Sequence, residues 1–173
     1  PNGAEEIDCV VFDFDGTLVE SNALKREAFF TIANRTEGGL AAMRRLYGQV
    51  KGDRLEIWRA WVRELSLPES SSLDLCQQYT ELVDPLVANA AEMRGASTLL
   101  AALRSARKTV FLSSATPRDN LMSIIKARGW TTFFEDIFGY PATKTETLKN
   151  EVLPRFKSAS RIVVVGDGLD DRT

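Results

Sequence analysis

The 173-residue sequence lacks a set of closely spaced cysteines, a long apolar run and a block of basic residues. Its two cysteines, Cys9 and Cys76, fall inside an apolar run and a helical pattern, so we expect two buried thiols in a reducing compartment and no disulfide. No apolar run approaches the length of about 18 residues that spans a bilayer, and no cationic segment precedes an apolar one at the start. We therefore predict a cytoplasmic protein with no signal peptide and no membrane partner.

The absence of basic clusters also limits the partners. The chain has 22 Lys and Arg residues against 24 Asp and Glu residues, a net charge of -2, and no basic block that would indicate nucleic-acid binding. We expect no nucleic-acid partner, whereas a small neutral or anionic ligand stays open. With 44% hydrophobic residues, the chain is long enough for one buried core and a small second lobe, as a monomer or a homodimer.

The sequence does contain four short apolar runs typical of a strand buried on both faces; three are rich in β-branched residues, and the one at residues 136–138 is a weaker instance. They occupy residues 7–12, 109–112, 136–138 and 161–165. Helical patterns follow at residues 97–107, 117–128 and 144–153. Thr116 and Pro117 form a typical N-cap and first helical residue. The alternation predicts an α/β fold with a Rossmann-like parallel sheet and a ligand site at the carboxyl ends of its strands.

Residues 19–94 differ from the rest because they show helical periodicity and no convincing strand. The expected helices lie at residues 22–35, 40–47, 53–65 and 73–93, the last interrupted at Pro85. We predict a helical domain over residues 19–94, inserted after the first strand. Residues 1–18 and 95–173 would then form the α/β core.

Two carboxylates follow the first strand in the stretch VVFDFDGTLVES. Strand alternation would place Asp13 and Asp15 on one side, with Phe14 turned toward apolar packing. Such a pair is unfavourable unless a cation or a shared proton offsets its repulsion, so it favours a metal site. An acidic turn at the strand end is the alternative. A calcium-binding EF-hand loop is excluded, because its glycine and its final glutamate are missing.

A second acidic cluster follows the last strand in VVVGDGLDD. Asp167, Asp170 and Asp171 suit a hard cation, and Mg²⁺ is usually held by one or two carboxylates with waters and a substrate phosphate. A polar loop that caps a helix at Asp167 or Asp170 is the alternative. A dinucleotide-binding fingerprint is excluded, because Asp171 stands where its third glycine belongs.

Two further polar residues follow strands. Ser114, in FLSSATP, precedes a helix N-terminus, where N–H groups and the helix dipole favour an anion; an ordinary helix cap is the alternative. Lys144, in GYPATKTE, is placed at the start of a helix, where a cation opposes the helix dipole and so suggests an anionic partner. Taken alone, it is better explained as a solvated surface lysine. The four signals follow successive strands, so a shared phosphate site explains them better than coincidence.

Taken in order, DFDGT at residues 13–17, FLSS ending at Ser114, Lys144 and GDGLDD at residues 166–171 resemble the four motifs of the haloacid dehalogenase superfamily. The second Asp of the first motif, Asp15, is typical of its phosphatase and phosphomutase branches, which include phosphoglycolate phosphatase and β-phosphoglucomutase. The inserted helices resemble the family's mobile helical cap. The resemblance implies a Mg²⁺-dependent phosphatase that acts on a small phosphorylated metabolite.

The resemblance also implies a role for each motif residue. Asp13 would be the nucleophile that takes the phosphoryl group, and Asp15 the general acid and base. Phosphate contacts would come from Thr17, Ser114, Ala115 and Lys144. Mg²⁺ ligands would come from Asp13, Asp15 through its backbone carbonyl, Asp167 and Asp171. Cap specificity would come from Lys25, Lys51 and Arg54, for which a solvated helical face paired with Glu27, Glu56 and Glu64 is the alternative.

Other functions stay open on the sequence alone. A phosphosugar mutase would use the same core, and the absence of histidine places it second. A receiver domain also gathers acids, a hydroxyl and a lysine around a phosphorylated Asp, but it is shorter and has no helical insertion. A non-enzymatic interaction protein could share the fold. Family members continue past the fourth motif with a further helix and strand, so we expect the C-terminal part of the core to be missing from a sequence that ends at Thr173.

Overall fold

The computed structural model describes residues 7–168 and divides the chain into two compact units. An α/β unit comprises Pro1–Ser21 with Ala88–Thr173, and a helical unit comprises Asn22–Val87. The helical unit is shorter than the expected residues 19–94, because both connecting segments pair with each other inside the α/β unit. Glu20 donates its N–H to the carbonyl of Ala91, and Met93 donates its N–H to the carbonyl of Leu18.

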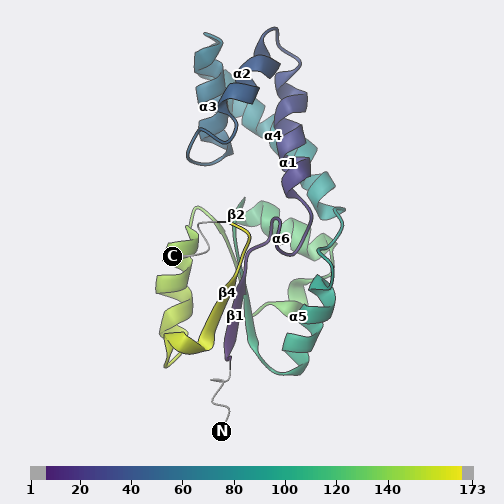
Figure 1. The fold of residues 1–173 in the computed structure, drawn as a ribbon, viewed down its shortest axis with the longest axis vertical. Helices are drawn as coiled ribbons and strands as arrows, with labels where there is room; N and C mark the ends of the chain where they lie inside the picture. Colours follow the sequence, from purple (N-terminus) through teal and green to yellow (C-terminus); the bar gives the residue numbers. More distant parts are fainter. Residues whose placement is uncertain (1–6, 169–173) are drawn as a thin grey trace. The chain divides into compact units, whose positions relative to one another are not determined.

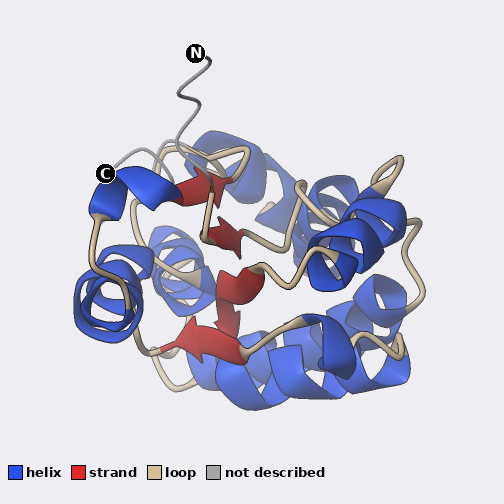
Figure 2. Ribbon diagram, turned by 90° about the horizontal axis from the view of Figure 1, so that it is seen from below, coloured by secondary structure: helices blue, strands red, loops and turns tan. Residues whose placement is uncertain are grey.

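The α/β unit contains a parallel sheet in the order β3-β2-β1-β4, which confirms the predicted fold class. Its strands are β1 (Cys9–Phe12), β2 (Thr109–Pro117), β3 (Asp136–Tyr140) and β4 (Ile162–Val165). Helices α5 (Ala96–Ser105) and α6 (Arg118–Ala127) lie on one face, and the helical residues 144–155 lie on the other (Figure 1). Seen along the strands, the sheet is a row with helices on both sides (Figure 2). Right-handed crossovers require this arrangement, since the chain moves from β1 toward β3 and then returns past β1 to β4.

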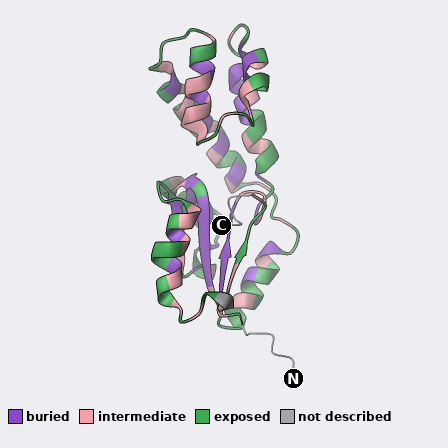
Figure 3. Cartoon of the chain, turned by 60° about the vertical axis from the view of Figure 1, so that its left-hand side comes forward, coloured by how far each residue is buried: buried purple, intermediate pink, exposed green. Residues whose placement is uncertain are grey.

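The strands differ in burial according to their place in the sheet. All four residues of β1 are buried, and β2 is buried over most of its length, as its purple colour shows in Figure 3. The prediction that the fourth apolar run is buried on both faces is wrong, because Val164 is 38% and Val165 36% exposed. Within the described residues β4 lies at the edge of the sheet, so only β1 covers it laterally.

Several element boundaries differ from those expected. β2 continues past Leu112 to Pro117, because it pairs with β3 first up to Ser113 and then again at Pro117 after a register shift. Helix α6 begins at Arg118, one residue later than expected. The predicted helix at residues 144–153 is a continuous helical segment of three kinds. It consists of α7 (Lys144–Glu146), the π-helical η2 (Thr147–Val152) and the 3₁₀ turn η3 (Leu153–Arg155).

The helical unit contains α1 (Asn22–Ala33), α2 (Gly39–Leu46), α3 (Arg54–Glu64) and α4 (Ser71–Ala88). Helix α4 continues through Pro85 instead of breaking there, with the buried Val83 and Val87 packing its last turns. Trp58 and Trp61 are almost fully buried and meet edge to face, which confirms that they belong to the core of this unit. No helix within residues 7–168 is long and apolar enough to cross a membrane. Both cysteines are free; Cys9 is buried as expected, whereas the expectation of a buried thiol is wrong for Cys76, which is half-buried.

Candidate active site

Asp13 is the first residue after β1, and the sheet itself holds its backbone. Its N–H donates to the carbonyl of Val165 on β4 over 2.8 Å, which continues the β1–β4 pairing by one residue. The side chain is only 8% exposed, and its Oδ1 accepts a 2.7 Å hydrogen bond from the N–H of Phe14. The fully buried Phe14 ring anchors the turn that follows. A carboxylate is therefore fixed at the carboxyl end of a central strand, where parallel sheets bind ligands.

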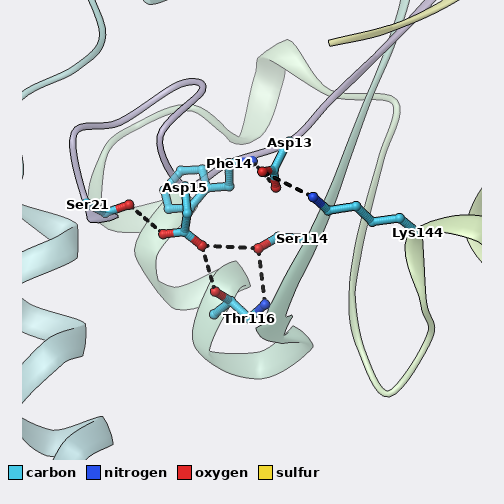
Figure 4. Close-up of polar contacts among 7 residues, drawn as sticks. All are labelled: Asp13, Phe14, Asp15, Ser21, Ser114, Thr116 and Lys144. Carbon is cyan, nitrogen blue, oxygen red and sulfur yellow. Dashed lines mark hydrogen bonds and ion pairs between the residues drawn. The ribbon is translucent and has the colours of Figure 1, made fainter. Parts of the chain in front are cut away.

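Lys144 supplies the positive charge that faces this carboxylate. Its Nζ lies 3.2 Å from Asp13 Oδ2, and its side chain is 15% exposed (Figure 4). Removal of two opposite charges from water is unfavourable unless they meet closely, and here they do. The structure thus brings together two residues that the sequence separates widely and that the motif order predicted to be neighbours.

Asp15 lies among hydroxyl groups instead. Ser21 Oγ donates to Asp15 Oδ1 over 2.6 Å, and Thr116 Oγ1 donates to Oδ2 over 3.2 Å. Ser114 Oγ lies 3.4 Å from the same Oδ2 atom. Figure 4 shows the Asp13 carboxylate directed toward Lys144 and the Asp15 carboxylate directed toward these hydroxyls. The two acids predicted to face one point therefore have distinct surroundings, which suits distinct chemical tasks.

The irregular end of β2 positions two of these hydroxyls. The register between β2 and β3 shifts between Ser113 and Pro117, so Ser114 and Thr116 lie in an irregularity that reorients side chains. Ser114 Oγ accepts a 3.1 Å bond from the N–H of Thr116 and is almost fully buried. The expectation that Thr116 caps α6 is wrong. Pro117 is the N-cap residue, and its side chain has no acceptor for a cap. The Thr116 hydroxyl donates to Asp15.

Thr17 lies in the turn after the two acids. Gly16 adopts a left-handed conformation (φ 73°), which lets the chain reverse so that Gly16 donates its N–H to the carbonyl of Val19. The Thr17 hydroxyl is buried and has no hydrogen-bond partner within the described residues. A buried hydroxyl in this position can donate to a ligand oxygen. Ala115, the other expected phosphate contact, is exposed at the end of β2.

The residues that could hold Mg²⁺ fit that ion in part. Asp167 is exposed and lies two residues after β4, and Asp13 directly follows β1, the strand that pairs with β4. Both carboxylates therefore lie at the carboxyl ends of neighbouring strands. Among residues 7–168 no three acidic or Cys side chains gather closely enough to hold a metal ion. Asp171 lies outside the described residues. Two carboxylates and a backbone carbonyl still fit Mg²⁺, which completes its shell with waters and substrate oxygens.

The expected specificity residues lie in the helical unit. Arg54 Nη1 donates to Thr80 Oγ1 over 2.8 Å, and its guanidinium lies over the ring of Tyr79. Lys25 is half-buried and Lys51 is exposed. The alternative paired these basic residues with neighbouring acids, but Glu56 pairs with Arg59 and Glu64 pairs with Arg45. A specificity role for Lys25, Lys51 and Arg54 stays a prediction.

Sequence reasoning missed Ser21 as a site residue and misassigned Thr116. Ser21 is fully buried and forms the shortest of the three hydroxyl contacts to Asp15, but nothing in the sequence pattern marks it. It also missed the capping box of Thr143 and Glu146 at the start of the helix that carries Lys144. The Thr-x-x-Glu spacing before a helix was a readable signal for that pair.

Comparison with known proteins agrees with this geometry. A family model described as haloacid dehalogenase-like hydrolase matches residues 7–173. A solved haloacid dehalogenase-like hydrolase from Streptococcus pneumoniae is 19% identical with a TM-score of 0.68, and the match covers 95% of this chain and 78% of that protein. A protein assigned by prediction as a phosphoglycolate phosphatase, from Haemophilus somnus, is 16% identical with a TM-score of 0.70, covering 98% and 80%. At such identities these structures show a common fold. No curated protein matches the chain in sequence.

Proposed function

Since the chain belongs to the haloacid dehalogenase-like hydrolase family, we propose that it is a Mg²⁺-dependent phosphatase for a small phosphorylated metabolite. The observation that carries the proposal is the close pair of Asp13 and Lys144 at the carboxyl end of the sheet, with Ser114 near it in Figure 4. A carboxylate that attacks phosphorus must approach an anionic group. The ammonium of Lys144 offsets that charge, and the Ser114 hydroxyl can donate to a phosphoryl oxygen.

In the first step, Asp13 forms a bond to phosphorus while the bond from phosphorus to the leaving oxygen breaks. Asp15 donates a proton to that oxygen, so the product leaves as an alcohol. In the second step, water attacks the phosphorylated Asp13 and gives a proton to Asp15. The Asp13 oxygen–phosphorus bond breaks, inorganic phosphate leaves, and both carboxyl groups return to their starting states.

Bound Mg²⁺ would supply electrostatic stabilisation of the phosphoryl charge, held by Asp13, Asp167 and the backbone carbonyl of Asp15. Asp171 is proposed to assist. Lys144, Ser114, Thr17 and the backbone of Ala115 orient the phosphoryl oxygens. For Thr17, the proposal gives the buried hydroxyl a partner.

The helical unit enters the proposal as the part that selects the leaving group. It follows the nucleophile strand directly in the chain, and it contains the basic side chains Lys25, Lys51 and Arg54. Their charges favour an anionic or polar substrate, which agrees with a phosphorylated metabolite. A cytoplasmic location and a monomeric or dimeric state stay predictions.

A phosphatase screen tests the proposal. Purified protein is incubated with p-nitrophenyl phosphate and a panel of phosphorylated metabolites, with Mg²⁺ or with EDTA, and released phosphate is measured. We expect Mg²⁺-dependent release that disappears in Asp13→Asn and falls at least about a hundredfold in Asp15→Asn. Release of phosphate by Asp13→Asn at the wild-type rate would refute the mechanism. If a phosphosugar isomer forms in place of free phosphate, the activity is that of a mutase and not of a hydrolase.

A further inference from the structure

The helix that carries Lys144 begins with reciprocal hydrogen bonds between Thr143 and Glu146. Thr143 Oγ1 accepts from the N–H of Glu146 over 3.2 Å, and Glu146 Oε2 accepts from the N–H of Thr143 over 2.9 Å. The Thr143 hydroxyl itself donates to the same carboxylate oxygen over 2.8 Å. These contacts form a capping box, with Lys144 as the first helical residue inside it.

Lys144 is placed unfavourably for an isolated helix. A cation in the first turn opposes the helix dipole, whereas a carboxylate in that turn is favoured. Glu146 supplies this carboxylate two residues after Lys144. The bonds from Thr143 also lower the pKa of Glu146 below its usual value, so the negative charge is held in place near neutral pH.

The start of this helix is short, and its cap is exposed. The α-helical part, α7, has only three residues before the π-helical part begins, and Thr143 and Glu146 are both exposed. A short helix depends strongly on its cap. The Thr143 backbone is extended (φ -76°, ψ 158°), so the helix begins abruptly at Lys144. A shift in that starting point would move the Lys144 backbone and with it the ammonium that faces Asp13.

We propose that Thr143 and Glu146 are positioning residues for Lys144: their capping box fixes the helix start so that the ammonium meets Asp13. The positioning of Lys144 by the capping box is independent of any activity, whereas the effect of that positioning on turnover rests on the proposed phosphatase function. Neither side chain is proposed to touch the substrate.

Trace acetylation of lysines with acetic anhydride, followed by mass spectrometry, tests the placement without any activity. In the native protein Lys144 is 15% exposed and ion-paired, so it reacts slowly. Thr143→Val keeps a residue suited to extended backbone and removes the capping hydroxyl. We expect its Lys144 to react about fivefold faster, the factor that corresponds to a cap worth about 1 kcal/mol. Thr143→Ser keeps the hydroxyl and should restore slow labelling.

Lys149, exposed within the same helical segment, is the internal control. The proposal requires its labelling rate to stay constant in Thr143→Val. An equal rise at Lys149 and Lys144 would mean that the whole segment loosens, and it would overturn a specific positioning role. Unchanged Lys144 labelling in Thr143→Val, or the same fast labelling in Thr143→Ser, would overturn it as well. Glu146→Ala provides a second route, and it should raise Lys144 labelling to the same level as Thr143→Val.

Hydrolysis of p-nitrophenyl phosphate then separates the two proposals. We expect kcat/KM of Thr143→Val to fall about fivefold and to recover in Thr143→Ser. If the wild-type protein releases no phosphate while the labelling pattern holds, the phosphatase proposal fails and the positioning role stands. If the wild-type protein hydrolyses the ester but Thr143→Val changes neither labelling nor kcat/KM, the positioning role alone fails.

Discussion

The ion pair of Lys144 and Asp13 should make a large contribution to the free energy of unfolding, and that contribution should depend on both partners. Lys144→Met removes the charge and keeps most of the side-chain volume. At 3.2 Å and an effective dielectric constant of about 20, the attraction is about 5 kcal/mol before desolvation is subtracted. The Asp13 side chain is only 8% exposed, so Lys144→Met leaves a poorly solvated carboxylate. We expect the free energy of unfolding to fall by about 3 kcal/mol, the lower end of the range for breaking a buried pair.

Urea unfolding of a double-mutant cycle measures this effect. Asp13→Asn removes the partner charge but keeps an acceptor for the N–H of Phe14. In the Asp13→Asn, Lys144→Met double variant, most of the loss should disappear, because no uncompensated charge remains. A coupling energy of about 2 kcal/mol is expected between the two sites. The reasoning is refuted if Lys144→Met costs less than about 0.5 kcal/mol, or if its cost is the same with Asn as with Asp at position 13.

Three further predictions concern single residues. Ser21→Ala removes the 2.6 Å bond to Asp15 from a fully buried position, and urea unfolding should show a loss of about 1.5 kcal/mol; a loss below about 0.5 kcal/mol would contradict the contact. Gly139→Ala would place a Cβ 2.6 Å from backbone at the start of α6, which cannot move easily. We expect the free energy of unfolding to fall by about 2 to 3 kcal/mol in the same assay, and a neutral effect would contradict the close approach. Burial raises the pKa of Cys9 to about 12 from 9.0, so the stability associated with its neutral thiol is present below pH 9 and is lost between about pH 9 and 12. Cys9→Ala should flatten that part of the curve of unfolding free energy against pH, and an unchanged curve would contradict the raised pKa.

The sequence predicted the parts of the fold that depend on local patterns. The apolar run of β1 and the Asp pair after it, the helical insertion, and the parallel pairing of the strands all follow from periodicity and from the rules of parallel sheets. The same rules indicated that Asp13 and Lys144 would meet, because both follow strands of one sheet. Side chains at the carboxyl ends of parallel strands share one edge whatever their separation in sequence.

The contacts of Asp15 could not be predicted in the same way. Thr116 has the residue type and position of a helix cap, and only the register shift in β2 turns its hydroxyl toward a carboxylate 101 residues away. Ser21 reaches Asp15 because the chain reverses at Gly16 and its connecting segment pairs with Ala91 and its neighbours. Both contacts depend on irregular backbone, for which periodic patterns carry no information.

The two acids after β1 illustrate how an unfavourable arrangement is made stable. Asp13 is a nearly buried anion, and Lys144 is a cation at the positive end of a helix, so each would be unfavourable alone. Each offsets the other, and Asp15 is stabilised separately by hydroxyls that carry no net charge. A phosphoryl group that enters beside Lys144 would bring its own negative charge to the ammonium. The ion pair can therefore be rearranged during binding, because the phosphoryl charge keeps the ammonium compensated. A strand end with two acids and no lysine would offer the phosphoryl group no such cation.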